Sequence, residues 1–466
     1  MYAERYCPFG TPVLIIRSIY ARAPKAGARL PLSAVIGIPS VALMQRHHVN
    51  NTVIKDIAIN GGRMRADFEA LAAIGSDGTD GVTRLALTAE DIHARAWFAD
   101  RIEEAGMRVH DDDAANLSAI LECSDPKART LVIGSHLDTV PDGGRFDGAV
   151  GVIAALECLR TIQDAGVELP VRLEAMNFTD DEGHYSSLFG ARAFVGSLTS
   201  EDIFDTRRDN AQLRAALRSV GSDARRALDA RRDPETLAGY LELHIEHGTR
   251  LEKSGCPIGV VTGIVGRKTH KITFLGQAGH SGTTDMYKRR DALRGAAMFI
   301  VRAHEKMRAR YGDGIFNVGD IDVKPGKFNI IPSEACCTVE FRHVQETLMV
   351  EMEREALQVA HECAAANALN IRHELITHMP AASMSAGFIS TIESVCDDYG
   401  IAHMPLISYA GHAGQFTAQI TPTGMIFIPS ADGIGHSPRE FTEWEEIERG
   451  ANVLLHTVLR WALSMG

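Results

Sequence analysis

The chain has 466 residues, 45% of them apolar, and a formal net charge of −12. This length exceeds that of one ordinary domain, so we expect a large hydrophobic core accompanied by a smaller domain. The acidic balance argues against non-specific nucleic-acid binding, because there is no basic excess with which to neutralise phosphates.

The cysteines indicate the redox environment. Eight of them are scattered along the chain without a Cys-x-x-Cys pair. Neither a disulfide framework nor a thiolate zinc site is indicated, and a reducing cytoplasm is the expected location.

Residues 1–55 differ from the rest of the chain, being rich in arginine and lysine and almost free of acids. Residues 30–44 are apolar enough for the core of a secretion signal, but Pro31 and Pro39 interrupt the run. We expect residues 1–55 to form a poorly ordered arm, with a secretion signal as the alternative. No later stretch is long and apolar enough to span a membrane.

Helical and extended patterns alternate through the first half of the chain, which predicts an α/β fold with a doubly wound, mainly parallel sheet. In such sheets the chemistry lies beyond the carboxyl ends of the strands. The expected helices cover 63–75, 88–106 and 148–166, and the expected strands cover 108–122 (a pair), 131–133 and 171–178.

A separate α+β unit follows from about residue 264. Its order of strand, helix, two strands, helix and strand is that of a ferredoxin-like sandwich, so we place an inserted domain at 264–376. The main domain then comprises 56–263 and 377–466. The expected elements of the insert are strands at 269–275, 316–323, 335–343 and 370–378 and helices at 290–311 and 347–369.

The segment 131–151, LVIGSHLDTVPDGGRFDGAVG, carries the first candidate chemistry. It places His136, Asp138 and Asp147 in a glycine-rich loop behind a short apolar strand, and imidazole and carboxylate groups are good ligands for divalent metals. A loop histidine with a purely structural role remains the alternative at this point.

Further candidate ligands follow other strands of the main domain. Two metal ions fit the set if one aspartate bridges them, since each ion then has three protein ligands and room for a water. Such ligands serve zinc, manganese, cobalt and nickel alike. The candidate ligands are His136, Asp147, Glu182, His244 and His436.

Seven motifs along residues 57–466 resemble, in type and order, those of the dinuclear-metal amidohydrolases. The family includes N-carbamoyl-L-amino-acid hydrolases, β-ureidopropionase and allantoate amidohydrolase, within the aminoacylase and carboxypeptidase-like zinc peptidases. The motifs are HLDTVPDGGRFDG, TDDEG, ELHIEHG, GQAGHSGTT, FNIIPSE with FRH, SYAGHAG and GIGHSPRE.

The resemblance implies a division of the ligands between two divalent ions. His136, Asp147 and His244 would hold one ion, and Asp147, Glu182 and His436 would hold the other. Asp138 would orient His136. The inserted domain would act as a lid and dimerisation domain.

The resemblance also implies that Asp181 is the catalytic base, at a position where family members carry glutamate. Aspartate is shorter by one carbon–carbon bond, about 1.5 Å, and a general base depends first on its reach. The neighbouring Asp180 is not expected to replace it, because adjacent side chains of an extended segment point to opposite faces.

Five residues are implied in substrate handling. His280 would reach into the active site of the partner in a homodimer and stabilise the oxyanion. Asn329 and Arg342 would hold the amide and the carboxylate of the substrate. Gly411 and His412 match a loop that closes over it.

Some positions depart from the family pattern. Asp285 replaces a proline, Ala413 and Gly414 replace an Asp-Ala pair, and His247 replaces a glutamine. None of these is a metal ligand in that pattern. Residues 267–270 and the pair His184-Tyr185 depart from the pattern as well. These departures cluster near where a substrate side chain would lie, so they bear on the identity of the substrate more than on the reaction.

The reaction implied is hydrolysis of a carbon–nitrogen bond in a small linear amide. The first substrate class expected is the N-carbamoyl-L-amino acids, which would give an amino acid, ammonia and carbon dioxide. The alternatives are an allantoate or ureidoglycolate amidohydrolase, an aminoacylase or dipeptidase, and a binding protein that lost its catalytic base at Asp181. Neither nucleic acid nor a membrane is an expected partner.

Overall fold

The computed structural model describes residues 55–76, 78, 80–204 and 210–466. The expected N-terminal arm, residues 1–55, lies outside the described residues apart from Lys55.

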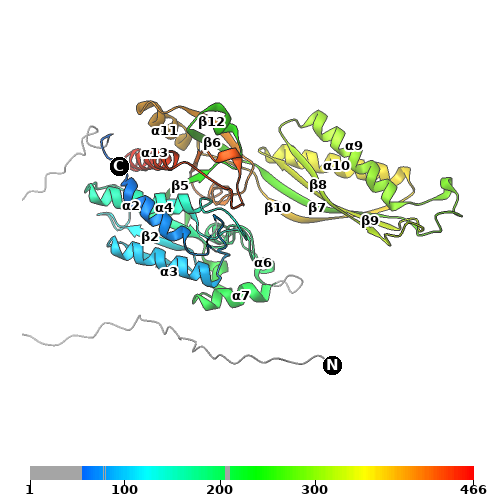
Figure 1. Cartoon of the computed structure of the whole chain (residues 1–466), viewed down its shortest axis with the longest axis horizontal. Coiled ribbons are helices and arrows are strands. Elements are labelled where there is room, and N and C mark those ends of the chain that lie inside the picture. The colour runs from blue at the N-terminus through cyan, green and yellow to red at the C-terminus, as the bar shows by residue number, and fades with distance from the viewer. Residues whose placement is uncertain (1–54, 77, 79, 205–209) are drawn as a thin grey trace, which may run out of the picture. The chain divides into compact units, whose positions relative to one another are not determined.

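The larger sheet, of which Figure 1 labels β2, β5, β6 and β12, has the order β1-β2-β4-β3-β5-β13-β6-β11, with β12 also pairing with β6. Its central strands β4, β3, β5 and β13 run parallel to one another, which confirms the predicted mainly parallel α/β sheet. The strands are β1 (Arg108–Asp111), β2 (Leu117–Leu121), β3 (Thr130–His136), β4 (Arg172–Phe178), β5 (Leu237–Ile245), β6 (Ile258–Ile264), β11 (Ala382–Ser383), β12 (His403–Ser408) and β13 (Thr423–Ile428).

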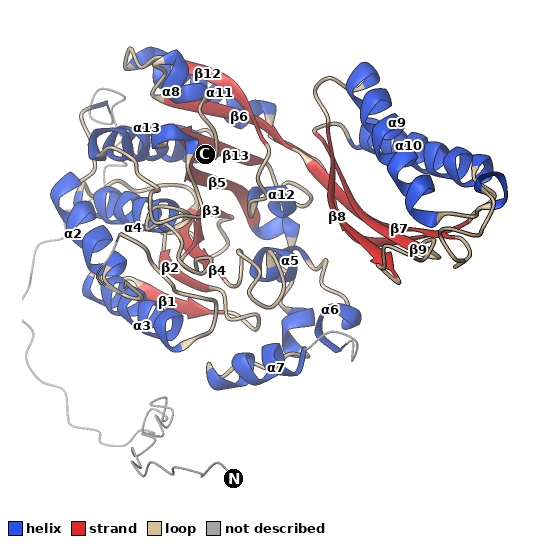
Figure 2. Cartoon of the chain, turned by 45° about the vertical axis from the view of Figure 1, so that its right-hand side comes forward, coloured by secondary structure: helices blue, strands red, loops and turns tan. Residues whose placement is uncertain are grey.

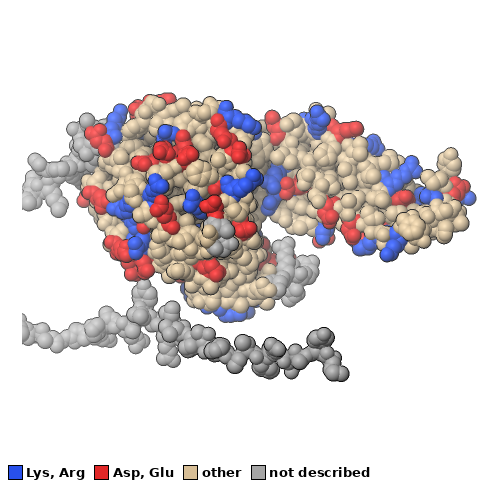
Figure 3. All heavy atoms as spheres, viewed as in Figure 1, with Lys and Arg blue, Asp and Glu red and all other residues tan. Residues whose placement is uncertain are grey.

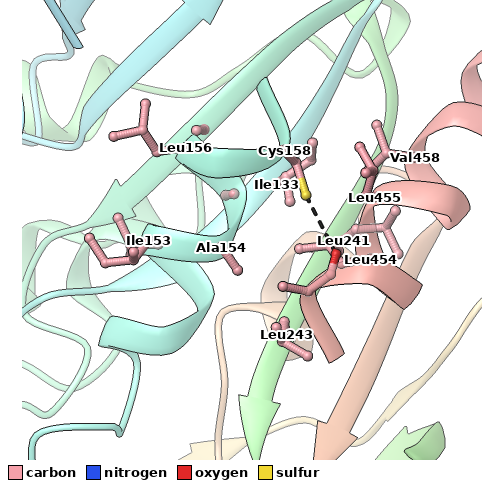
Figure 4. Close-up of a cluster of buried hydrophobic side chains, with 14 of the residues drawn as sticks. Ile133, Ile153, Ala154, Leu156, Cys158, Leu241, Leu243, Leu454, Leu455 and Val458 are labelled. Atoms are coloured by element: carbon pink, nitrogen blue, oxygen red, sulfur yellow. Dashed lines mark hydrogen bonds between the residues drawn. The ribbon is translucent and has the colours of Figure 1, made fainter. Parts of the chain in front are cut away.

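Helices cover this sheet and close its core. Helix α4 is apolar nearly all round and almost wholly buried, as expected for a helix packed between a sheet and other helices. Helix α13 packs beside it, so that the Cys158 Sγ atom lies 3.8 Å from the Ala451 carbonyl oxygen (Figure 4). The longer helices are α2 (Gly61–Ala72), α3 (Ala89–Glu104), α4 (Ala149–Asp164), α11 (Ala386–Asp398) and α13 (Trp444–Leu463), and the shorter ones are α5 (Phe189–Val195), α6 (Ser200–Phe204), α7 (Asn210–Ser219), α8 (Arg250–Ser254) and α12 (Gly414–Thr417).

A second sheet of the described chain has the order β10-β7-β9-β8, with antiparallel neighbours throughout. Along β9 buried and half-buried residues alternate, and helices α9 and α10 cover the buried face (Figure 2). This unit has a hydrophobic cluster of its own. Its elements are β7 (Gly266–Leu275), α9 (Ala292–Arg310), β8 (Ile315–Lys324), β9 (Glu334–His343), α10 (Glu346–Ala366) and β10 (Asn370–Met379).

Charged side chains of both signs are intermixed on the face shown in Figure 3. Among the helices that the structure describes, none is long and apolar enough to cross a membrane. The cysteines of the described residues are all free thiols.

Candidate metal centre

The predicted ligands gather where the central parallel strands end. His136 is the last residue of β3, and His244 is the last but one of β5. Glu182 follows β4, His436 follows β13, and Asp147 lies just before α4. The carboxyl ends of parallel strands share one edge of the sheet, which explains why residues so distant in sequence meet.

Asp147 lies at the centre of this group. Its Oδ1 atom is 3.6 Å from His136 Nε2 and 3.1 Å from His244 Nε2. Its Oδ2 atom is 3.4 Å from His436 Nε2, which in turn is 3.3 Å from Glu182 Oε1. The five predicted ligands therefore come together, with the two oxygens of one carboxylate facing different partners.

Local backbone features hold Asp147 in place. The Glu440 carboxylate accepts hydrogen bonds from the backbone N–H groups of Phe146 and Asp147, at 2.8 and 2.9 Å. The next residue, Gly148, has φ of +64°, and a Cβ atom there would lie 2.4 Å from the His136 ring. A glycine is required at this position on both counts.

The buried carboxylates of the cluster shift the pKa values of the imidazoles around them. Burial would lower the pKa of His136, but the carboxylates of Asp181 and Asp147 outweigh it and raise that pKa well above its usual value. Burial would raise the pKa of Asp147, but the imidazoles of His247 and His136 hold it well below its usual range. Contacts with two carboxylates raise the pKa of His436 to about 10. A divalent cation would supply the positive charge that these carboxylates attract.

The geometry also fits an ion better than a hydrogen-bonded cluster. Asp147 Oδ2 is buried and accepts no hydrogen bond from any described residue, although the His436 imidazole nitrogen lies 3.4 Å away. Buried carboxylate oxygens without hydrogen bonds are costly, and metal coordination is one of the few ways to satisfy them. The residues present therefore fit a divalent metal.

Asp138 makes a different contact from the one implied by its position. The Nδ1 atom of His136 lies 2.9 Å from the backbone carbonyl oxygen of Asp138 and 3.8 Å from its carboxylate. The Asp138 carboxylate accepts hydrogen bonds from the backbone N–H groups of Asp181 and Glu182, at 3.3 and 3.1 Å. Its side chain thus braces the loop that carries the candidate base, and its carbonyl group orients the histidine.

Asp181 points into the cavity and Asp180 points away from it. Asp181 is buried, and its Oδ1 atom has no hydrogen-bond partner among the residues that the structure describes. Burial raises the pKa of its carboxyl group well above the usual value, with His136 acting in the opposite sense. The Asp180 carboxylate instead accepts hydrogen bonds from the N–H groups of Tyr185 and Ser186, at 3.0 and 2.7 Å.

A cavity of about 260 Å³ adjoins the cluster, and Arg342, Gly411 and His412 line it together with the ligands. Arg342 donates from Nη1 to the Tyr409 carbonyl oxygen at 2.6 Å and from Nε to Glu340 at 2.8 Å. His412 is buried beside His244, and burial together with that neighbour lowers its pKa well below the usual value.

Two predicted residues lie elsewhere. His280 forms a β-bridge with Ile330, and the Ser281 N–H group donates to the Asn329 carbonyl oxygen at 3.1 Å. His280 and Asn329 are therefore neighbours, both exposed, and neither lines the cavity within a single described chain. The expectation that they act on a partner subunit stays a prediction.

The structure adds residues that the sequence did not single out as site residues. His247 Nε2 lies 3.3 Å from Asp147 Oδ2, and its spacing of three residues from His244 was a signal that could have found it. Arg267, which the sequence marked only as a departure from the family pattern, also lines the cavity, directly opposite Arg342 in the second sheet. Glu440 had no local signal, because its role depends on a contact across 293 residues of sequence.

A mainly parallel α/β sheet whose strand ends gather histidines and acids around a shared carboxylate is the arrangement of a metal-dependent hydrolase. The chain matches the profile described as "Peptidase family M20/M25/M40" over residues 132–460, and it belongs to that family.

Relatives with assigned names agree with this. The chain is 36% identical over 410 residues to the N-carbamoyl-L-amino acid amidohydrolase of Geobacillus stearothermophilus, an alignment that covers 88% of this chain and 100% of that one. It is 28% identical over 421 residues to the ureidoglycolate hydrolase of Arabidopsis thaliana, covering 87% and 88%.

A solved structure is similar in fold as well. The amidase of the hydantoinase/carbamoylase family from Burkholderia multivorans superposes with a TM-score of 0.77 at 32% identity, covering 87% of this chain and 99% of that one. The resemblance found in the sequence motifs is confirmed, and the chain is a hydrolase that acts on amides.

Proposed function

We propose that this hydrolase cleaves the ureido group of an N-carbamoyl-L-amino acid, using two divalent ions held around Asp147. The observation that carries the proposal is the single cavity in which the Asp147 cluster and Arg342 meet. Its lining combines a cluster suited to hydrolytic chemistry with a guanidinium suited to a carboxylate.

His136, Asp147 and His244 would hold one ion, and Asp147, Glu182 and His436 would hold the other, as zinc, manganese, cobalt or nickel. When bound, such ions activate a water and polarise the substrate carbonyl group. Asp147 can serve both positions because its two oxygens face different imidazoles.

Asp181 would take the proton of the attacking water and pass it to the leaving nitrogen. Support comes from its unpartnered Oδ1 atom and its place in the cavity lining. The backbone N–H groups of Asp181 and Glu182 donate hydrogen bonds to Asp138. These bonds would keep the Asp181 carboxylate aimed at the substrate.

Arg342 would bind the carboxylate of the substrate, with Arg267 beside it. The two arginines are paired across β7 and β9. Burial is the main cause that lowers the pKa of Arg267, and the charge of Arg342 is the second. Arg342 keeps Glu340 as an ion-pair partner at 2.8 Å, and a planar guanidinium with further N–H donors suits a substrate carboxylate.

Residues 264–376 would act as a lid and dimerisation domain, with His280 and Asn329 serving the partner's site in a homodimer. Support comes from their exposure and mutual contact away from the cavity of their own chain. Gly411 and His412 would close over the substrate from the main domain.

The test is ammonia release by the purified protein across N-carbamoyl-L-amino acids, N-carbamoyl-β-alanine, allantoate and ureidoglycolate. We expect metal-dependent release with the N-carbamoyl-L-amino acids, lost on EDTA treatment and in Asp147→Asn. Release from ureidoglycolate or allantoate in preference would replace the substrate assignment. The metal-loaded protein could instead hydrolyse none of these compounds, nor any acyl amino acid or dipeptide. If Asp181→Glu also failed to restore activity, the protein would be identified as a binding protein.

A further inference from the structure

His247 lies on the same side of Asp147 as His436. Its Nε2 atom is 3.3 Å from Asp147 Oδ2, compared with 3.4 Å for His436 Nε2. With His136 and His244 on the Oδ1 side, each oxygen of the shared carboxylate faces two imidazole nitrogens. The ligand sets implied by the sequence motifs include His436 but not His247, so they count only one of the two imidazoles on the Oδ2 side.

The separation matches two ligands of one ion. Donors held at about 2.0–2.1 Å from a tetrahedral zinc ion lie roughly 3.3 Å apart. A hydrogen bond between a charged imidazole and a carboxylate is shorter, about 2.7–2.9 Å. The His247 contact has the longer value, and Asp147 Oδ2 accepts no hydrogen bond within the described chain.

The backbone around His247 is built to keep its ring in that place. The buried Glu246 side chain accepts hydrogen bonds from the N–H groups of Arg250 and Leu251, at 3.1 and 2.9 Å, which fixes the loop after β5. The imidazole ring lies over Gly435, where a Cβ atom would come within 2.3 Å of its Nδ1 atom. A side chain at position 435 would displace the ring.

We propose that His247 is a fourth protein ligand of the ion on the Oδ2 side, alongside Asp147, Glu182 and His436. The inference rests on the proposed metal-dependent function and deepens it. With four protein ligands, this position binds its ion more tightly than the Oδ1 position, which has the three ligands Asp147, His136 and His244. The ion there is retained when the Oδ1 ion is removed by a chelator.

The test is a chelator titration of the zinc-loaded protein, with the visible spectrum of the cobalt-loaded protein as a second readout. For His247→Gln, which restores the residue of the family pattern, and for His247→Ala, we expect affinity for one ion to fall at least about tenfold while the other is unchanged. The cobalt spectrum changes with the loss of a nitrogen ligand. The matched control is His93→Gln, which changes an exposed histidine on α3. We expect this variant to keep its affinity for both ions.

Unchanged affinity for both ions and an unchanged cobalt spectrum in the two variants would overturn the role of His247 while leaving the proposed function standing. A wild-type protein that binds fewer than two ions would overturn both. The unaffected ion reports that the variant is folded, so loss of one ion cannot be mistaken for unfolding.

Discussion

At the scale of single residues, Asp181 and Asp180 are adjacent in sequence, but their carboxylates have different surroundings. Asp181 has a free oxygen in the cavity, and Asp180 is engaged by two backbone N–H groups. We expect Asp181→Asn to lower kcat about 10²–10⁴-fold, because a general base is removed, with both ions still bound. Asp180→Asn should keep most of the turnover. Equal losses of kcat in the two variants would refute the base assignment.

Substitution of Arg342 tests the proposed binding of the substrate carboxylate. Loss of charge-assisted hydrogen bonds to a carboxylate costs about 1.5–3 kcal/mol, so we expect Arg342→Ala to raise KM by roughly one to two orders of magnitude. Arg372→Ala, an exposed arginine on β10, is the control. Steady-state kinetics with a substrate and its carboxamide analogue provide the measurement, since the effect should vanish when the substrate has no carboxylate. A KM penalty of the same size for both compounds would contradict the assignment.

At the scale of elements, helix α4 offers a matched pair of glycines. Gly148 before it and Gly166 after it have positive φ, +64° and +62°, so alanine strains the backbone at both positions. A Cβ at 148 would meet the His136 ring at 2.4 Å, whereas nothing lies within 4 Å at 166. We expect both variants to lose stability, and only Gly148→Ala to lose metal as well, measured by elemental analysis. Metal loss in both would show that strain alone disrupts the site.

The contact between α11 and α13 predicts a dependence of stability on pH. Burial and the nearby Arg460 lower the pKa of His456 to about 4, and its Nδ1 atom lies 3.1 Å from the Tyr399 hydroxyl group. The unfolded chain therefore binds more protons than the folded one between pH 4 and about 6.5. The contribution of this histidine is complete above that window and is lost as the pH falls through it.

His456→Gln isolates this effect from that of the other titrating groups. We expect the melting temperature of the wild type to fall more between pH 7 and pH 5 than that of the variant. Parallel pH profiles for the two proteins would contradict the assignment to His456.

The sequence predicted elements and ligand types better than contacts. Hydrophobic periodicity located α4 and the central strands, because burial against a sheet imposes a local pattern. The five candidate ligands were predicted because each lies in a motif, at a strand end or in a glycine-rich loop. The bracing role of Asp138 and the anchor Glu440 could not be predicted, since both depend on side-chain directions set by distant packing. His247 was noticed only as a departure from a pattern, because spacing alone cannot tell which way a loop imidazole points.

At the scale of the whole molecule, the exposed pair His280 and Asn329 predicts complementation between subunits. His280→Ala and Asp147→Asn should each be inactive alone. In a mixed dimer, the intact metal site of one chain would meet the intact His280 of the other, so mixing the two proteins should restore activity. Activity no greater than the sum of the separate proteins would place His280 in its own chain's chemistry or outside the reaction.

The position of β13 has a consequence for how the protein is made. This strand lies between β5 and β6 in the middle of the large sheet, although it is the last strand of that sheet in the chain. Until it has been synthesised, the nascent chain carries two open strand edges side by side, and such edges template association with other chains. His436, which follows β13, is also the last of the five candidate ligands to be synthesised. We therefore expect chains halted before Thr423 to bind chaperones or aggregate, while chains that extend past His436 close the sheet and the metal centre together.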